Sequence, residues 1–144
     1  MAIPSASICA SLRVLDMPEH EVVPGSLRRW FVFHGVVDAL FAVPLFLAPG
    51  TTLSALGVPG GDPLLGRMVA AALVAIGGHS LRMRRADVSA YRAMLDLKLL
   101  WSGAAMAALL FGGSMSGPLR AVFLLFFVFF CVWARFRFRA PFRR

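Results

Sequence analysis

Charged residues are scarce in this sequence, and acidic residues are the scarcest of them. Only 15% of the 144 residues are charged, with seven acidic residues against 15 basic ones. Soluble domains usually carry about 25% charged residues, so this composition argues against a soluble globular protein. Lysine is nearly missing as well, because Lys98 is the only lysine and all the other basic residues are arginines.

Cysteine and histidine are too few to suggest a catalytic or metal site. The two cysteines, Cys9 and Cys131, lack the spacing of metal ligands, and we expect two unpaired thiols. No motif fixes a reaction, so the sequence favours a protein that is not an enzyme. The formal charge of +8 does not predict nucleic-acid binding, since the arginines lie at the ends of apolar runs rather than across a polar domain.

Long apolar runs are abundant, in keeping with 59% hydrophobic residues. Four runs, about 30–47, 64–81, 95–111 and 119–134, each have the length that a helix needs to cross a bilayer. The sequence therefore predicts an all-α, polytopic membrane protein with an antiparallel bundle of four transmembrane helices. Residues 28–137 would form this domain, between an N-terminal arm (1–27) and a basic C-terminal tail (138–144).

The arginines predict how the chain is threaded, because basic residues gather in cytoplasmic loops. Only Arg67 and Arg120 fall on one side of the four runs. We expect the other side, with both termini, to be cytoplasmic at the inner (plasma) membrane. Its basic residues are Arg13, Arg28, Arg29, Arg82, Arg84, Arg85, Arg92, Lys98, Arg135, Arg137, Arg139, Arg143 and Arg144.

Two aspartates predict helix starts. Asp62 stands before Pro63, which is the usual order of an N-cap and a first helical residue. Asp87 is expected to help cap the third helix. Residues 53–56, in the loop before Asp62, suggest a short turn at the interface.

The second run is rich in small residues, which allow helices to approach closely in lipid. The pairs Gly66/Ala70 and Ala71/Ala75 are each four residues apart. We therefore expect this helix at the centre of the bundle. Because the loop 82–92 is short, the second and third helices are also expected to be neighbours.

Five ionisable residues lie in the half of the runs nearer the arginine-rich side, and they come from three different runs. Such groups in hydrocarbon normally face the bundle interior and pair with one another. Asp38 and Lys98 have similar expected depth and opposite charge, which makes them the preferred pair. The candidate pocket in the cytoplasmic leaflet consists of His34, Asp38, His79, Asp96 and Lys98. Alternatively these residues only fix helix register, or His34 and His79 ligate a haem.

The fourth run is apolar and aromatic on all sides, and a tail that alternates arginine with phenylalanine follows it. Such a helix is typical of contact with lipid or with another protein. The tail is expected to be an interfacial anchor, with a strand as the alternative. The residues predicted to contact lipid or a partner are Phe123, Phe126, Phe127, Phe130, Trp133, Arg135, Arg137 and Arg139.

A few scattered segments accompany the four runs: Leu47-Ala48-Pro49-Gly50, Leu56-Gly57, Arg67, Gly77-Gly78 and residues 97–102. Together with the number of runs and the loop lengths, these segments resemble those of small four-helix bacterial inner-membrane proteins, broadly DoxX-like. The likeness covers about residues 30–137, and no catalytic motif is matched residue by residue. It implies the same architecture and, through some relatives, a redox association.

These patterns lead to one prediction of function and two alternatives. The first is a non-catalytic accessory or structural subunit that packs in a larger membrane complex or self-associates, with no cofactor. The second is a membrane redox component that binds a small ligand, such as a quinone, a lipid or a haem, in the polar pocket. The third is a small transporter.

Overall fold

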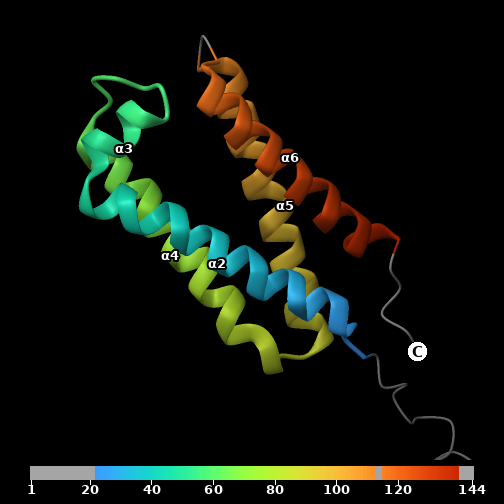
Figure 1. Cartoon of the computed structure of the whole chain (residues 1–144). Coiled ribbons are helices and arrows are strands. Elements are labelled where there is room, and N and C mark those ends of the chain that lie inside the picture. The colour runs from blue at the N-terminus through green and yellow to red at the C-terminus, as the bar shows by residue number, and fades with distance from the viewer. Residues whose placement is uncertain (1–21, 113–114, 140–144) are drawn as a thin grey trace, which may run out of the picture.

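A computed structural model describes residues 22–112 and 115–139, and its helices account for nearly all of them (Figure 1). Four helices are long and apolar enough to cross a membrane, which confirms the predicted all-α polytopic bundle. The protein is thus a multi-pass membrane protein whose exposed apolar side chains contact lipid. The elements are α2 (Gly25–Leu47), α3 (Pro49–Ala55), α4 (Pro63–Arg82), the 3-10 helix η1 (Met83–Arg85), α5 (Val88–Phe111) and α6 (Gly117–Phe138).

The helix starts follow the capping residues. The Asp62 carboxylate accepts a hydrogen bond from the backbone N–H of Leu64 at 2.7 Å, with Pro63 at the first helical position of α4. Asp87 accepts one from the backbone N–H of Ala90 at 3.0 Å and caps α5. Both predicted caps are therefore confirmed.

The helices are longer than the apolar runs that predicted them. α2 begins at Gly25, inside the predicted N-terminal arm, and α5 begins at Val88 as one continuous helix. α6 continues to Phe138, so the described part of the arginine–phenylalanine tail is helical rather than a strand. The rest of the predicted arm and tail, residues 1–21 and 140–144, lies outside the described residues. The sequence indicated only a turn where α3 forms a seven-residue helix.

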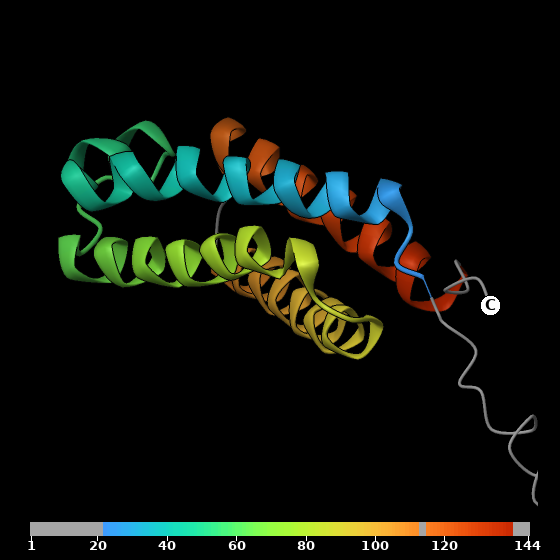
Figure 2. The same cartoon turned by 90° about the horizontal axis from the view of Figure 1, so that it is seen from below.

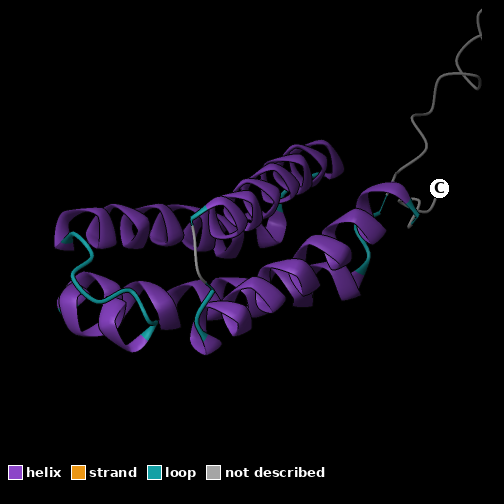
Figure 3. Ribbon diagram, turned by 90° about the horizontal axis from the view of Figure 1, so that it is seen from above, coloured by secondary structure: helices purple, strands orange, loops and turns teal. Residues whose placement is uncertain are grey.

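The four long helices form two closely packed pairs. α2 packs along α4 and α5 packs along α6, as seen from two directions in Figures 1 and 2. α4 has close backbone contact mainly with α2, so the prediction that α4 lies at the centre of the bundle is wrong, and the contact between α4 and α5 is limited. The short connection fixes only the helix ends, and η1 turns the chain before α5 begins. Figure 3 shows these helices joined by short loops, without strands in the part that the structure describes.

Glycines allow α2 and α4 to approach each other. A Cβ atom on Gly35 would lie 3.0 Å from the backbone oxygen of Gly77, and Gly66 and Ala70 are buried on the same side of α4. These two residues behave as the sequence predicted. Ala71 and Ala75, the other predicted pair, are exposed instead.

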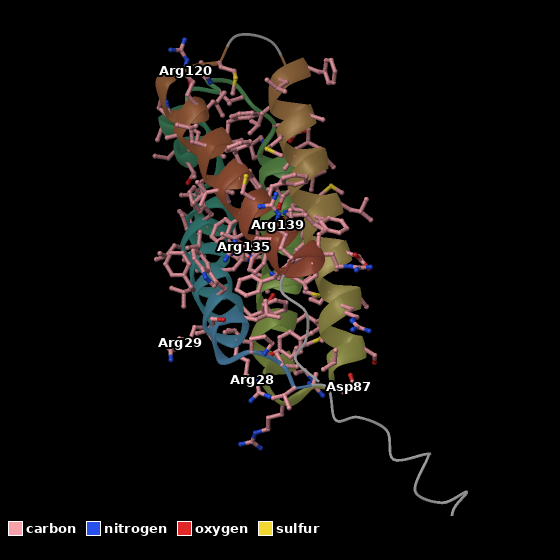
Figure 4. All side chains as sticks on the ribbon, turned by 90° about the vertical axis from the view of Figure 1, so that its right-hand side faces the viewer. Arg28, Arg29, Asp87, Arg120, Arg135 and Arg139 are labelled. Carbon is pink, nitrogen blue, oxygen red and sulfur yellow. The ribbon has the colours of Figure 1, made fainter. Side chains whose placement is uncertain are left out.

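The bundle has two different ends. Arg28, Arg29 and Asp87 lie together at one end, here called the arginine-rich end, and Arg120 lies at the other (Figure 4). That other end also carries α3 and is called the α3 end. The largest buried side chains cluster toward the arginine-rich end: Leu27, Phe31, Tyr91, Leu95 and Trp133.

Candidate functional site

A buried cluster of three ionisable side chains joins the two helix pairs. The Nζ atom of Lys98, from α5, lies 3.1 Å from Nδ1 of His34 in α2. The same Nδ1 atom lies 2.8 Å from Oδ2 of Asp38, one helical turn further along α2. The three residues are 1%, 3% and 6% exposed, respectively. We call them the polar triad; it links α2 to α5 although their backbones are not closely packed.

Aromatic rings surround the lysine. Its Nζ atom lies 5.0 Å from the ring centre of Phe31 and 4.9 Å from that of Trp133. The His34 ring packs edge-on against Phe129 at 4.5 Å and against Trp133 at 5.3 Å. Ring faces attract a cation and offset part of the cost of removing it from water. The lysine therefore sits in an aromatic cage on the side of the triad nearer the arginine-rich end.

A glycine on α4 makes room for the aspartate. A Cβ atom on Gly77 would lie 2.8 Å from the Cβ of Asp38 and 3.0 Å from its Oδ2. Any larger residue would push the carboxylate away from α4. Sequence reasoning included Gly77 only in the Gly77-Gly78 pair of the family resemblance, because the position of Asp38 against it depends on how α2 and α4 cross.

A cavity of about 630 Å³ begins at the triad and extends to the α3 end. His34, Asp38 and Phe129 are at its inner end, and Leu53 and Asp62 are at its outer end. Its walls come from all four long helices and are mostly apolar. Small residues of α5 keep it open: Ala104, Ala105 and Ala108.

Trp101 is a residue of the cavity wall that sequence reasoning missed. The residue lines the wall, and its indole Nε1 atom is buried without a hydrogen-bond partner among the described residues. Sequence reasoning included it only in the segment 97–102 of the family resemblance, since tryptophan in a membrane helix is usually interpreted as an apolar or interfacial residue. Its indole N–H draws attention only because it is buried without a partner among the described residues.

The structure brings together three of the five predicted pocket residues. His34 lies between Asp38 and Lys98, which were expected to pair directly. His79 is exposed on α4 and does not line the cavity. Asp96 instead bonds to Arg137 of α6, with Oδ1 2.6 Å from Nε. The cavity itself extends away from the arginine-rich end, whereas the sequence predicted a pocket on that side.

The aromatic residues of α6 divide into four groups. Trp133 was predicted to contact lipid or a partner, but it is fully buried in the core, so this prediction is wrong. Phe126 lines the cavity, while Phe127 is exposed on the outer surface. Phe123 and Phe130 are half-buried, and the described arginines Arg135 and Arg139 are exposed.

Among the described residues, no three histidine, cysteine or acidic side chains gather as they would around a metal ion. The alternative of haem ligation by His34 and His79 stays a prediction, although the contacts of His34 are with Lys98 and Asp38. No protein-family model, curated protein or solved structure matches the chain. The DoxX-like resemblance therefore stays a prediction as well.

Proposed function

We propose that the protein binds an apolar small molecule, of lipid type, in the cavity between its two helix pairs. The observation that supports this is the cavity of about 630 Å³, with apolar walls and the polar triad at its inner end. Small-molecule sites typically measure about 300–1,000 Å³ and combine apolar walls with a few polar groups.

The side chains around the cavity favour a ligand over a packing defect. α5 has three alanines on the cavity wall, while large side chains fill the same bundle nearer the arginine-rich end. A bound apolar molecule would restore the dispersion contacts that the walls otherwise lack.

This proposal develops the ligand-binding alternative from the sequence. The accessory-subunit and transporter roles stay predictions, because no described feature selects a protein partner or a path across the membrane. No reaction is assigned to the triad. A haem or quinone as the bound molecule also stays a prediction.

Native mass spectrometry after gentle purification in detergent tests the proposal. We expect a bound molecule that survives purification, and Ala105→Phe should remove it by filling the cavity. Ala71→Phe adds the same ring on the exposed face of α4 and should retain the molecule. A protein without any bound molecule in its native membrane extract, or equal binding by both variants, would overturn the proposal.

We also propose that the arginine-rich end faces the cytoplasm at the plasma membrane. Arg28, Arg29 and Arg82 stand near that end, against Arg67 and Arg120 toward the α3 end. This excess follows the usual asymmetry of basic residues in membrane proteins.

Labelling of single cysteines in intact cells tests this orientation. Both positions chosen are exposed: Ser26 at the start of α2 and Thr51 in α3. With Cys9 and Cys131 replaced by serine, Thr51→Cys should react with a membrane-impermeant maleimide. Ser26→Cys should react only after the cells are permeabilised, and the reverse pattern would refute the orientation.

A further inference from the structure

The cavity is closed to different degrees on its two sides. Its lining residues that are exposed all belong to α5 or to α4 with the loop before it. On α4 they include Leu65 and Val69, which are 59% and 46% exposed. On α5 they are Ala104 and Ala108. The lining residues of α2 and α6 are buried or half-buried instead. The cavity therefore opens on the side where α4 faces α5.

Large side chains close the opposite side, between α2 and α6. Val37 of α2 and Leu125 of α6 both line the cavity and pack against the large buried cluster near the arginine-rich end. Phe41, one turn beyond Val37, packs against the smaller buried cluster of α2 and α4. The rings of Phe33 and Phe129 meet across the same two helices, with their centres 6.1 Å apart. Side-chain size thus decides which side of the cavity is open, because the alanines of α5 leave space that these residues fill.

Contacts also bound the opening along the bundle. Toward the arginine-rich end, Ile76 of α4 packs against the large buried cluster, and Trp101 of α5 packs against the cluster of α2 and α4. At the α3 end, Oγ of Ser116 at the start of α6 donates a hydrogen bond to the backbone oxygen of Leu56 at 3.0 Å. Between these contacts α4 and α5 diverge as they leave η1 (Figure 1). The opening therefore faces the leaflet at the α3 end.

The cavity is long and narrow. Its wall extends from Asp62, at the start of α4, to the level of Asp38, which lies against Gly77. These two positions of α4 are roughly 20 Å apart at about 1.5 Å per residue. A volume of about 630 Å³ over this length leaves a mean cross-section of about 30 Å². This shape suits one extended alkyl chain better than a broad, rigid ring system.

We infer that the alkyl chain of a membrane lipid enters the cavity sideways, from the leaflet at the α3 end, through the opening between α4 and α5. The edge of the opening is continuous with the surface that contacts lipid, because exposed Leu64 and Met68 stand beside Leu65 and Val69 on α4. A chain that follows this route passes from lipid into an apolar cavity without crossing water. The inference rests on the proposed ligand-binding function and names the class of ligand and its route.

A reversible bridge across the opening tests the route. In protein with Cys9 and Cys131 replaced by serine, Val69→Cys and Ala108→Cys place one thiol on each edge of the opening. A bifunctional methanethiosulfonate joins the two thiols, and dithiothreitol separates them again. Both positions are exposed and therefore accessible to the reagent.

A second pair of cysteines is the matched control. Leu40→Cys and Ala121→Cys lie on exposed positions of α2 and α6, and neither residue lines the cavity. The same reagent should bridge the closed side of the bundle there. This bridge restrains the two helix pairs as the first one does, but it does not cross the opening.

The exchange of a bound probe is the readout. Protein in phosphatidylcholine nanodiscs is loaded with deuterated 1-tetradecanol before or after bridging, and the unlabelled alcohol is then added. Native mass spectrometry follows the deuterated probe on the protein. We expect the bridge between α4 and α5 to retain a probe that was loaded first and to exclude a probe that is added later. Dithiothreitol should restore exchange in both cases, and the control bridge should leave exchange unchanged.

The outcomes separate the route from the binding function. Free exchange with the bridge between α4 and α5 in place, or exchange blocked only by the control bridge, overturns the route. Release of a probe loaded before bridging also overturns it, because a closed route has to stop movement in both directions. If the unbridged protein binds the probe and Ala105→Phe removes it, the ligand-binding function stands in each of these cases. If the unbridged protein binds no probe and no native molecule is found, both proposals are refuted.

Discussion

The two halves of this bundle use the same four helices but fill the space between them in different ways. Toward the arginine-rich end, Phe31 contacts Tyr91 and Trp133 with ring centres 4.8 Å and 5.5 Å apart. Toward the α3 end, α5 presents Ala104 and Ala108 to a cavity. Side-chain size, rather than the number of helices, therefore decides where the bundle is closed. The polar triad lies at the boundary between the two halves.

The largest effect is expected at this boundary. Lys98→Met removes the cation and leaves a buried aspartate without its counter-charge, which should lower the free energy of unfolding by about 3–5 kcal/mol. The measurement is unfolding in mixed micelles, followed by circular dichroism. Asp38→Leu should also destabilise the protein, because it leaves the lysine unpaired in its aromatic cage.

The double variant Asp38→Leu/Lys98→Met is the control for this prediction. Without either charge, it should be more stable than the less stable single variant. Strictly additive losses would show that Lys98 and Asp38 are not coupled through His34. The charge pairing of the triad would then be wrong.

A smaller effect is expected within the closed half, where an aromatic residue is surrounded on all sides. Trp133→Ala should lower the free energy of unfolding by about 3 kcal/mol, because Trp133 is 0% exposed and packs against Phe31 and Phe129. Phe126→Ala, in the open half of the same helix, should cost less than about 1 kcal/mol in protein freed of lipid. A side chain that borders a cavity has fewer contacts to lose.

Both variants are compared by the same unfolding measurement, again without bound lipid. Equal losses would mean that the open half is as tightly packed as the closed half. An added lipid-type probe such as 1-tetradecanol sharpens the contrast between the two halves, since it should stabilise the native protein by occupying the cavity. It should have little effect on a protein that carries Ala105→Phe.

The sequence predicted those features that depend on local chemistry. The four spans follow from apolar length, and the start of α4 follows from Asp62 and Pro63. His34 and Asp38 share a face of α2 because they are four residues apart. Lys98 was placed at about the right depth by counting residues, although the histidine between the two charges was not foreseen.

Features that depend on how the helices cross could not be predicted from the sequence. α6 is apolar on every side, so no polar face distinguishes buried Trp133 from exposed Phe127. Asp96 points toward α6 because it lies two residues from Lys98 on a different face of α5. A cavity leaves no pattern in a sequence, because it results from small side chains that several helices bring to one place.

The last comparison concerns the close approach of α2 and α4, which holds the triad in position, and it is expected to change the free energy of unfolding least among the substitutions in the core. Gly77→Ala places a methyl group 2.8 Å from the Cβ of Asp38, and overpacking of this kind costs about 1–3 kcal/mol. Gly78→Ala is the matched control, since a Cβ there has nothing within 4 Å. It should be neutral or stabilising by up to about 1 kcal/mol, because alanine favours a helix more than glycine does. Equal stability of the two variants would show that the position of the Asp38 carboxylate does not depend on Gly77. Other residues of α4 would then set the close approach of α2 and α4.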